Sequence, residues 1–214
     1  NCLGFLDLSS FGENYKYSGC AGMADVVLAL QWVKENIEVF GGDPDNVTVA
    51  GQSGGGGKAA ILMQMPPADG LYHKVISQSG ALRDRSGTSI TEEKRHWQSL
   101  GEKTAEILGL TKENIETIDA VPYEELAKAA VQAGKILGFP GGMMLFEPSP
   151  AEGFYEGLAS IVGFREETKH IPVMAGTVLG EFAFMHYLGD KTRYTEVDKY
   201  NILEQNYGKN TMSI

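Results

Sequence analysis

The chain has 214 residues, and 43% of them are hydrophobic, which is enough for an ordinary globular domain with a buried core. No run of apolar residues is long enough to span a membrane, and the formal net charge of −10 argues against nucleic acid or an anionic membrane as a partner. Two cysteines, Cys2 and Cys20, are too few for a disulfide framework. We expect separate free thiols in a reducing compartment such as the cytoplasm, with a single bridge between them and secretion as the alternatives.

The first part of the chain predicts a helix, a strand, a helix and a second strand. Apolar residues recur at helical spacing over 23–37, and the turn residues GGDPDN at 41–46 end that helix. The short apolar segment VTVAG at 47–51 predicts a strand, and the segment over 55–65 predicts a helix. HKVISQSG, at 73–80, predicts a second buried strand.

The middle of the chain predicts helices. The first of them begins at Ser89, has Glu92 three residues later in the pattern of a capping box, and ends at Gly109. Two shorter helices are expected over 112–120 and 123–134.

The last part predicts a third buried strand, IPVMAGT at 171–177, and a helix, GEFAFMHYL at 180–188. Strands that alternate with helices predict an α/β fold, in which a mostly parallel sheet carries helices on both faces. The helical stretch of about 86–165 interrupts this alternation, and we interpret it as a cap or substrate region. We expect residues 1–214 to be the central part of a single domain and an internal piece of a longer protein.

One motif in this framework carries chemistry. The run from Gly51 to Gly55 (GQSGG) fits the pattern G-x-S-x-G and places Ser53 between a predicted strand and a predicted helix. This is the nucleophile elbow, a strained turn that lifts a serine above the edge of a sheet. The positions two residues before and after Ser53 are expected to require glycine, because strand and helix pass too close together there for a side chain. The amide of Gly54, at the start of the helix, can serve a developing oxyanion. The alternative is a glycine-rich loop without chemistry.

At these residues the chain resembles the type-B carboxylesterases, a family that includes para-nitrobenzyl esterases, carboxylesterases and cholinesterases. The resemblance is carried by the segments LGFL, AGMADVVLALQWVKENIEVFGGDPDNVTVAGQSGGG, LYHKVISQSG and HIPVMAGTVLGEF, which cover most of 1–80 and 170–185. It implies the α/β-hydrolase fold. It also implies hydrolysis of small-molecule carboxylic esters through an acyl-enzyme on Ser53, with no cofactor or metal.

The resemblance implies roles for further residues. Glu181, in a segment like G-T-x-x-x-E, matches the acid of the family's catalytic triad, and the alternative is that it begins the following helix. Ser79 matches a serine near the triad, where a supporting hydrogen bond and a plain buried position at a strand end are equal alternatives. Only Gly54 of the oxyanion hole has a counterpart here, because the family carries the main oxyanion loop upstream.

The triad histidine of the family lies far downstream of the acid. None of the four histidines, which are His73, His96, His170 and His186, fits that position. We therefore expect the catalytic histidine beyond residue 214 and structural roles for these four.

The chain departs from the family at two positions of the motif. Gln52 stands where the family usually has Glu, and Gly54 where it usually has Ala. Loss of a carboxylate beside the nucleophile predicts a preference for neutral esters over cationic ones. A group of apolar loop residues is expected either to line an acyl or alcohol pocket or to pack, and it comprises Phe139, Met143, Met144, Leu145 and Phe146.

The alternative hypothesis is that the protein is not an enzyme but an esterase-like binding or adhesion protein that has lost catalysis. Such relatives tend to lack the serine or the acid. The presence of both Ser53 and Glu181 therefore favours the enzyme.

Overall fold

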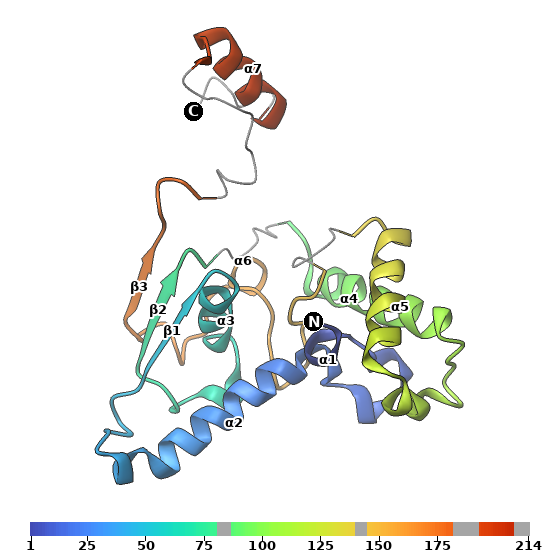
Figure 1. The fold of residues 1–214 in the computed structure, drawn as a ribbon. Helices are drawn as coiled ribbons and strands as arrows, with labels where there is room; N and C mark the ends of the chain where they lie inside the picture. The colour runs from blue at the N-terminus through green and yellow to red at the C-terminus, as the bar shows by residue number, and fades with distance from the viewer. Residues whose placement is uncertain (81–86, 140–144, 182–192, 208–214) are drawn as a thin grey trace. The chain divides into compact units, whose positions relative to one another are not determined.

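The computed structural model describes residues 1–80, 87–139, 145–181 and 193–207 (Figure 1). The chain forms two compact units, residues 1–177 and 178–214, and each is described by itself. Most of the predicted helix over 180–188 lies outside the described residues, as do Met143, Met144 and His186.

In the part of the chain that the structure describes, three strands form a parallel sheet. They are β1 (Thr48–Gln52), β2 (Lys74–Gln78) and β3 (Val173–Gly176), and they lie in the sheet in chain order. The register aligns Gln52 with Gln78 and Gln78 with Gly176, so the carboxyl ends of the strands meet at one edge. The three strands predicted from the sequence are confirmed.

Two helices pack on one face of this sheet. They are α2 (Ala21–Asn36) and α3 (Gly54–Leu62), which share a core cluster with Val49 and Val75 of the strands. Strand side chains alternate between faces, and on the opposite face Ala50 is exposed and Met174 is 69% exposed. The second helical layer expected over that face is not among the described residues.

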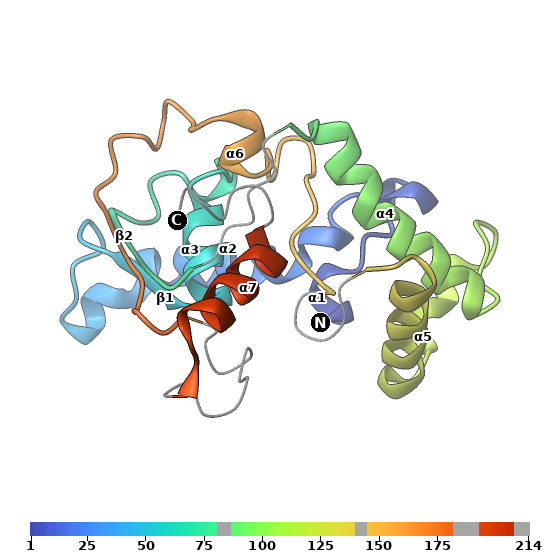
Figure 2. The ribbon, with the colours of Figure 1, turned by 90° about the horizontal axis from the view of Figure 1, so that it is seen from above.

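The remaining helices of the first unit lie to one side of the sheet (Figure 2). They are α4 (Ile90–Ile107) and α5 (Tyr123–Ile136), with the short α1 (Cys2–Phe5) beside them and α6 (Ala159–Val162) nearer the sheet. Short 3-10 turns connect the elements, at Ser9–Phe11, Glu13–Tyr15, Ser18–Cys20, Ile37–Phe40, Pro66–Ala68 and Ile115–Ala120.

The capping box predicted for α4 is confirmed. The Ser89 hydroxyl accepts from the Glu92 amide, and the Glu92 carboxylate accepts from the Ser89 amide at 2.7 Å. The helix expected over 112–120 is instead a six-residue 3-10 turn. A segment this short gains little from helix propensity, and 3-10 geometry is common in such short pieces.

A second core cluster lies between α4 and α5. The amino-terminal segment contributes Cys2, Leu6 and Leu8, which pack with Leu100 of α4 and Leu126 of α5. The start of the chain therefore contributes to both clusters, because Phe5 packs in the sheet cluster together with α2.

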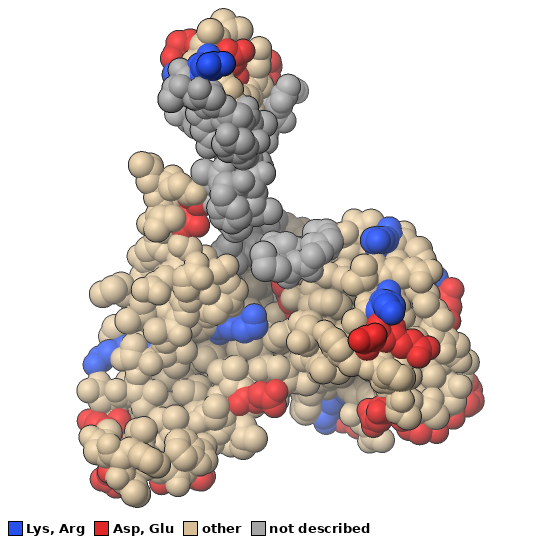
Figure 3. Space-filling view, viewed as in Figure 1, with Lys and Arg blue, Asp and Glu red and all other residues tan. Residues whose placement is uncertain are grey.

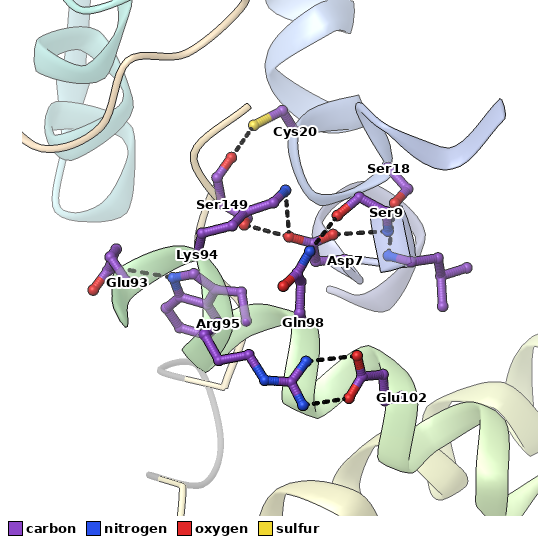
Figure 4. A network of polar contacts seen from close by, with 12 residues as sticks. Asp7, Ser9, Ser18, Cys20, Glu93, Lys94, Arg95, Gln98, Glu102 and Ser149 are labelled. Carbon is purple, nitrogen blue, oxygen red and sulfur yellow. Dashed lines mark hydrogen bonds and ion pairs between the residues drawn. The ribbon is translucent and has the colours of Figure 1, made fainter. Parts of the chain in front are cut away.

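A buried polar network joins these parts (Figure 4). The Asp7 carboxylate is fully buried, pairs with Nζ of Lys94 at 2.8 Å and accepts from the Ser149 hydroxyl at 2.5 Å. Its other oxygen accepts from the Ser9 amide at 2.9 Å. The thiol of Cys20 donates to the Ser149 carbonyl at 2.6 Å. Three segments far apart in sequence are thus held together, which fixes α4 against the amino-terminal segment.

Both cysteines are free, as expected from the sequence, and both are buried. Burial raises the pKa of the Cys20 thiol to about 12, and burial also raises the pKa of Cys2.

Acidic and basic side chains are interspersed over the α4 and α5 region in Figure 3. There Arg95 donates to both oxygens of Glu102, at 2.6 and 2.7 Å, and these hydrogen bonds lower the pKa of Glu102.

The second unit contains α7 (Glu196–Tyr207). Just before this helix, the Thr195 amide donates to the Asp198 carboxylate at 2.8 Å. Among the described helices, none has the length and apolar character needed to cross a membrane.

Candidate active site

The predicted strand–serine–helix arrangement is present at the carboxyl edge of the sheet. β1 ends at Gln52, α3 begins at Gly54, and Ser53 stands between them with φ 55° and ψ −124°. Residues other than glycine rarely adopt such a backbone conformation, and it persists only where the surrounding structure enforces it. Ser53 is exposed, as a nucleophile that must meet a substrate would be.

Two glycines make this turn sterically feasible. A Cβ added at Gly51 would lie 2.2 Å from the carbonyl carbon of Gly55, and one at Gly56 would lie 2.9 Å from the Gly80 Cα. A Cβ at Gly55, however, would meet nothing within 4 Å. The expectation that both outer glycines of the motif must lack side chains is therefore wrong for Gly55. The Gly55 backbone lies against Gly51, but a side chain on Gly55 itself would point into open space.

The start of α3 supplies amide donors beside Ser53. The first N–H groups of a helix have no partner within the helix, and the positive end of the helix dipole lies there. The helix has nine residues and begins with Gly54, whose N–H directly follows the serine. The Ser53 carbonyl accepts from the Gly57 amide at 3.0 Å, which continues the helix from the serine onward.

Ser79 occupies the equivalent place on the neighbouring strand. Because Gln52 pairs with Gln78, Ser53 and Ser79 are each the first residue beyond the paired strand ends. The Ser53 amide donates to the Gln78 carbonyl at 2.8 Å. Ser79 has φ 49°, and Ser53 and Ser79 are the two non-glycine residues with positive φ in the described ranges. Ser79 is half-buried, so it is more accessible than a plain core serine.

Glu181 lies in the second unit, in a turn that follows β3. Its carboxylate accepts from the Val178 amide at 3.0 Å. The Glu92 carboxylate makes the same contact with the Ser89 amide at the start of α4. This hydrogen bond therefore fits the alternative that Glu181 begins a helix. Its role as a triad acid stays a prediction.

Two of the described histidines, His73 and His96, make structural contacts. Nδ1 of His73 accepts from the Val47 amide at 3.1 Å. His73 precedes β2, and at about 3.3 Å per residue it lies about 16 Å from the carboxyl edge where Ser53 stands. His96 stacks on the Phe139 ring at 4.0 Å, and His170 is exposed ahead of β3.

The apolar loop residues that the structure describes pack in the interior. Leu145 is 2% exposed and belongs to the helical core cluster, to whose edge Phe139 and Phe146 also pack. A cavity of about 320 Å³ lies elsewhere, between α3 and the strands β2 and β3. Its lining includes Ala60, Ile61, Gln64, Ser77, Leu158 and Phe164.

The sequence did not single out Ser77. This residue of β2 is 9% exposed, and its hydroxyl donates to the Gly56 carbonyl of α3 at 3.2 Å. Only the folded chain brings these two segments together, so no local pattern could have indicated the contact.

Residues 1–213 match the family model described as the carboxylesterase family. The chain belongs to this family. It is 35% identical to para-nitrobenzyl esterase of Bacillus subtilis (strain 168), over a match that covers 96% of this chain and 40% of that protein. It is 31% identical to carboxylesterase 1C of Rattus norvegicus, with 84% of this chain and 34% of that protein covered.

Solved carboxylesterase structures match this chain as well. An esterase of Clostridium hathewayi, described as hydrolysing aliphatic aromatic polyesters, has 42% identity and a TM-score of 0.73, with 96% of this chain and 40% of that one covered. A thermophilic para-nitrobenzyl esterase has 33% identity and a TM-score of 0.74, covering 98% of this chain and 41% of its own. The carboxylesterase resemblance and the α/β-hydrolase fold are thereby confirmed. This carboxylesterase chain matches 34–41% of the length of those relatives.

Proposed function

We propose that the protein containing this chain hydrolyses carboxylic esters with Ser53 as nucleophile. The observation that carries the proposal is the strained, exposed Ser53 between β1 and α3. A backbone conformation this costly is typical of functional positions, and the helix start beside it provides donors for a negative charge.

The reaction has two halves. The Ser53 hydroxyl oxygen attacks the ester carbonyl while a general base takes its proton, and the resulting oxyanion is stabilised by the Gly54 amide among other donors. The tetrahedral intermediate collapses, the alcohol leaves with the proton, and an acyl-enzyme remains. Water, activated by the same base, then releases the carboxylic acid and restores Ser53.

Further parts of the site belong to the proposal. The general base is a histidine outside residues 1–214, oriented by Glu181. Ser79, one strand away from Ser53, supplies a supporting hydrogen bond near the triad. The helical stretch of about 86–165 is a cap or substrate region within a single catalytic domain.

Gln52 directs the substrate preference toward neutral esters. It is exposed and is the last residue before Ser53. A neutral amide at this place offers a cationic alcohol group much less attraction than a carboxylate would.

The test is to treat the whole protein with a fluorophosphonate probe and to map the adduct by mass spectrometry. We expect labelling of Ser53, loss of labelling in Ser53→Ala, and retained labelling in Ser79→Ala, the neighbouring serine with the same backbone geometry. Labelling of another residue would reject Ser53 as the nucleophile. No labelling together with no ester hydrolysis would favour the rival, a non-catalytic esterase-like binding protein.

A further inference from the structure

The first turn of α3 is unusually weak for the task that the proposed function assigns to it. It consists of Gly54, Gly55, Gly56 and Gly57, and glycine is the least favourable helix residue after proline. An oxyanion donor must be held in place before the reaction to be effective. Residues outside the helix must therefore restrain this turn.

The segment at the end of β2 makes the restraining contacts. The Ser77 hydroxyl donates to the Gly56 carbonyl at 3.2 Å. A Cβ on Gly80 would lie 2.2 Å from the Ser77 hydroxyl oxygen and 2.6 Å from the Gly56 carbonyl carbon, so these three residues are tightly packed. The Gln78 carbonyl, between them, accepts from the Ser53 amide at 2.8 Å.

We infer that Ser77 is a positioning residue for the nucleophile turn. Its hydroxyl ties the glycine turn of α3 to β2 and thereby holds the Gly54 amide where the oxyanion forms. Ser77 itself is 9% exposed and touches no substrate in this role. The inference rests on the proposed function, because it names a residue that serves the same site.

The chain offers a matched control at the other end of α3. There Thr168, which is 2% exposed, donates its hydroxyl to the Met63 carbonyl at 2.8 Å. Thr168→Val removes a buried hydroxyl–carbonyl bond of the same kind, far from the glycine turn. A merely structural role for Ser77 predicts that Ser77→Ala and Thr168→Val behave alike.

The first experiment measures ester hydrolysis by the whole protein. We expect Ser77→Ala to lower kcat about threefold to tenfold with KM nearly unchanged, because the lost hydrogen bond acts on transition-state stabilisation. Thr168→Val should leave kcat near the wild-type value. Ser77→Thr should retain activity, since it keeps the hydroxyl and its methyl group can enter the adjoining cavity.

A double-mutant cycle tests the tether directly. Gly55→Ala stiffens the first turn, and its Cβ would meet nothing within 4 Å. If Ser77 acts by restraining the glycine turn, then Ser77→Ala should lower kcat much less in the Gly55→Ala background than in the wild type. An equal loss of kcat in both backgrounds would overturn the inference.

Amide hydrogen exchange over 53–60 provides a readout that does not depend on activity. Ser77→Ala should accelerate exchange there, and adding Gly55→Ala should slow it again, whereas Thr168→Val should not accelerate it. Accelerated exchange without any ester hydrolysis in the wild type would reject the proposed function and leave the tether standing. Unchanged exchange together with unchanged kcat would reject the tether alone.

Discussion

Nζ of Lys94, in α4, lies 2.8 Å from Oδ2 of Asp7, whose side chain has no exposed surface. The pair connects the amino-terminal segment to the helical cluster, and the same carboxylate oxygen accepts from the Ser149 hydroxyl. Close packing surrounds it, because a Cβ on Gly101 would lie 1.9 Å from the Asp7 carbonyl oxygen. The junction thus has little room to rearrange when a partner is lost.

We expect Asp7→Asn to lower the free energy of unfolding by about 3 kcal/mol, because it removes one partner of a buried ion pair. Urea unfolding measures this. The control is Lys103→Met, which breaks the Lys103–Glu106 pair, in which the Glu106 side chain is 68% exposed. That change should cost less than about 0.5 kcal/mol. Equal losses in the two variants would show that the Asp7 pair is no more important than a surface pair.

The two outer glycines of the motif should respond differently to alanine. Gly51→Ala places a Cβ 2.2 Å from the backbone of Gly55, and we expect it to destabilise the protein by about 3 kcal/mol. Gly55→Ala meets open space and should stabilise α3 by about 0.5–1 kcal/mol. Thermal unfolding distinguishes these outcomes. A loss at Gly55 comparable to that at Gly51 would contradict the observed asymmetry.

Cys20 should make stability depend on alkaline pH. Its pKa rises from 9.0 to about 12, mainly through burial, so the folded state holds the proton more tightly than the unfolded state. The contribution is complete below pH 9.0 and is lost as the pH rises toward about 12. Between these values the free energy of unfolding should fall more steeply in the wild type than in Cys20→Ala, by about 1.4 kcal/mol per pH unit. Parallel pH profiles would show that Cys20 titrates normally.

Selectivity should follow the charge at Gln52. We expect the wild-type protein to have a higher kcat/KM for a neutral thioester with a tert-butyl group than for acetylthiocholine. Gln52→Glu should shift this ratio toward the cationic ester by about tenfold, because a charge pair at 4 Å gains about 4 kcal/mol before desolvation at an effective dielectric of about 20. Gln132→Glu, at an exposed position on α5, adds the same charge elsewhere and serves as control. Equal use of both esters by the wild type would remove Gln52 as the determinant.

The sequence predicted helices well where the evidence for them lies in residues close together in the chain. The capping box at Ser89 and the apolar periodicity of α2 depend on residues three or four positions apart, and both were confirmed. The prediction of a helix over 112–120 was wrong in its bounds and geometry, because so short a segment gains little from propensity and forms a 3-10 turn over Ile115–Ala120.

The sequence by itself determined that Ser53 stands between a strand and a helix, because the G-x-S-x-G motif is flanked by a segment with a strand pattern and a segment with a helical pattern. Only the tertiary structure decided which glycines are needed, since Gly51 and Gly56 are constrained by backbone that they face, and Gly55 is not. It also decided that Ser77 supports α3 and that Lys94 pairs with Asp7, which lies 87 positions away in the chain. Such contacts depend on the relative placement of segments far apart in sequence, and no local periodicity or motif carries that information.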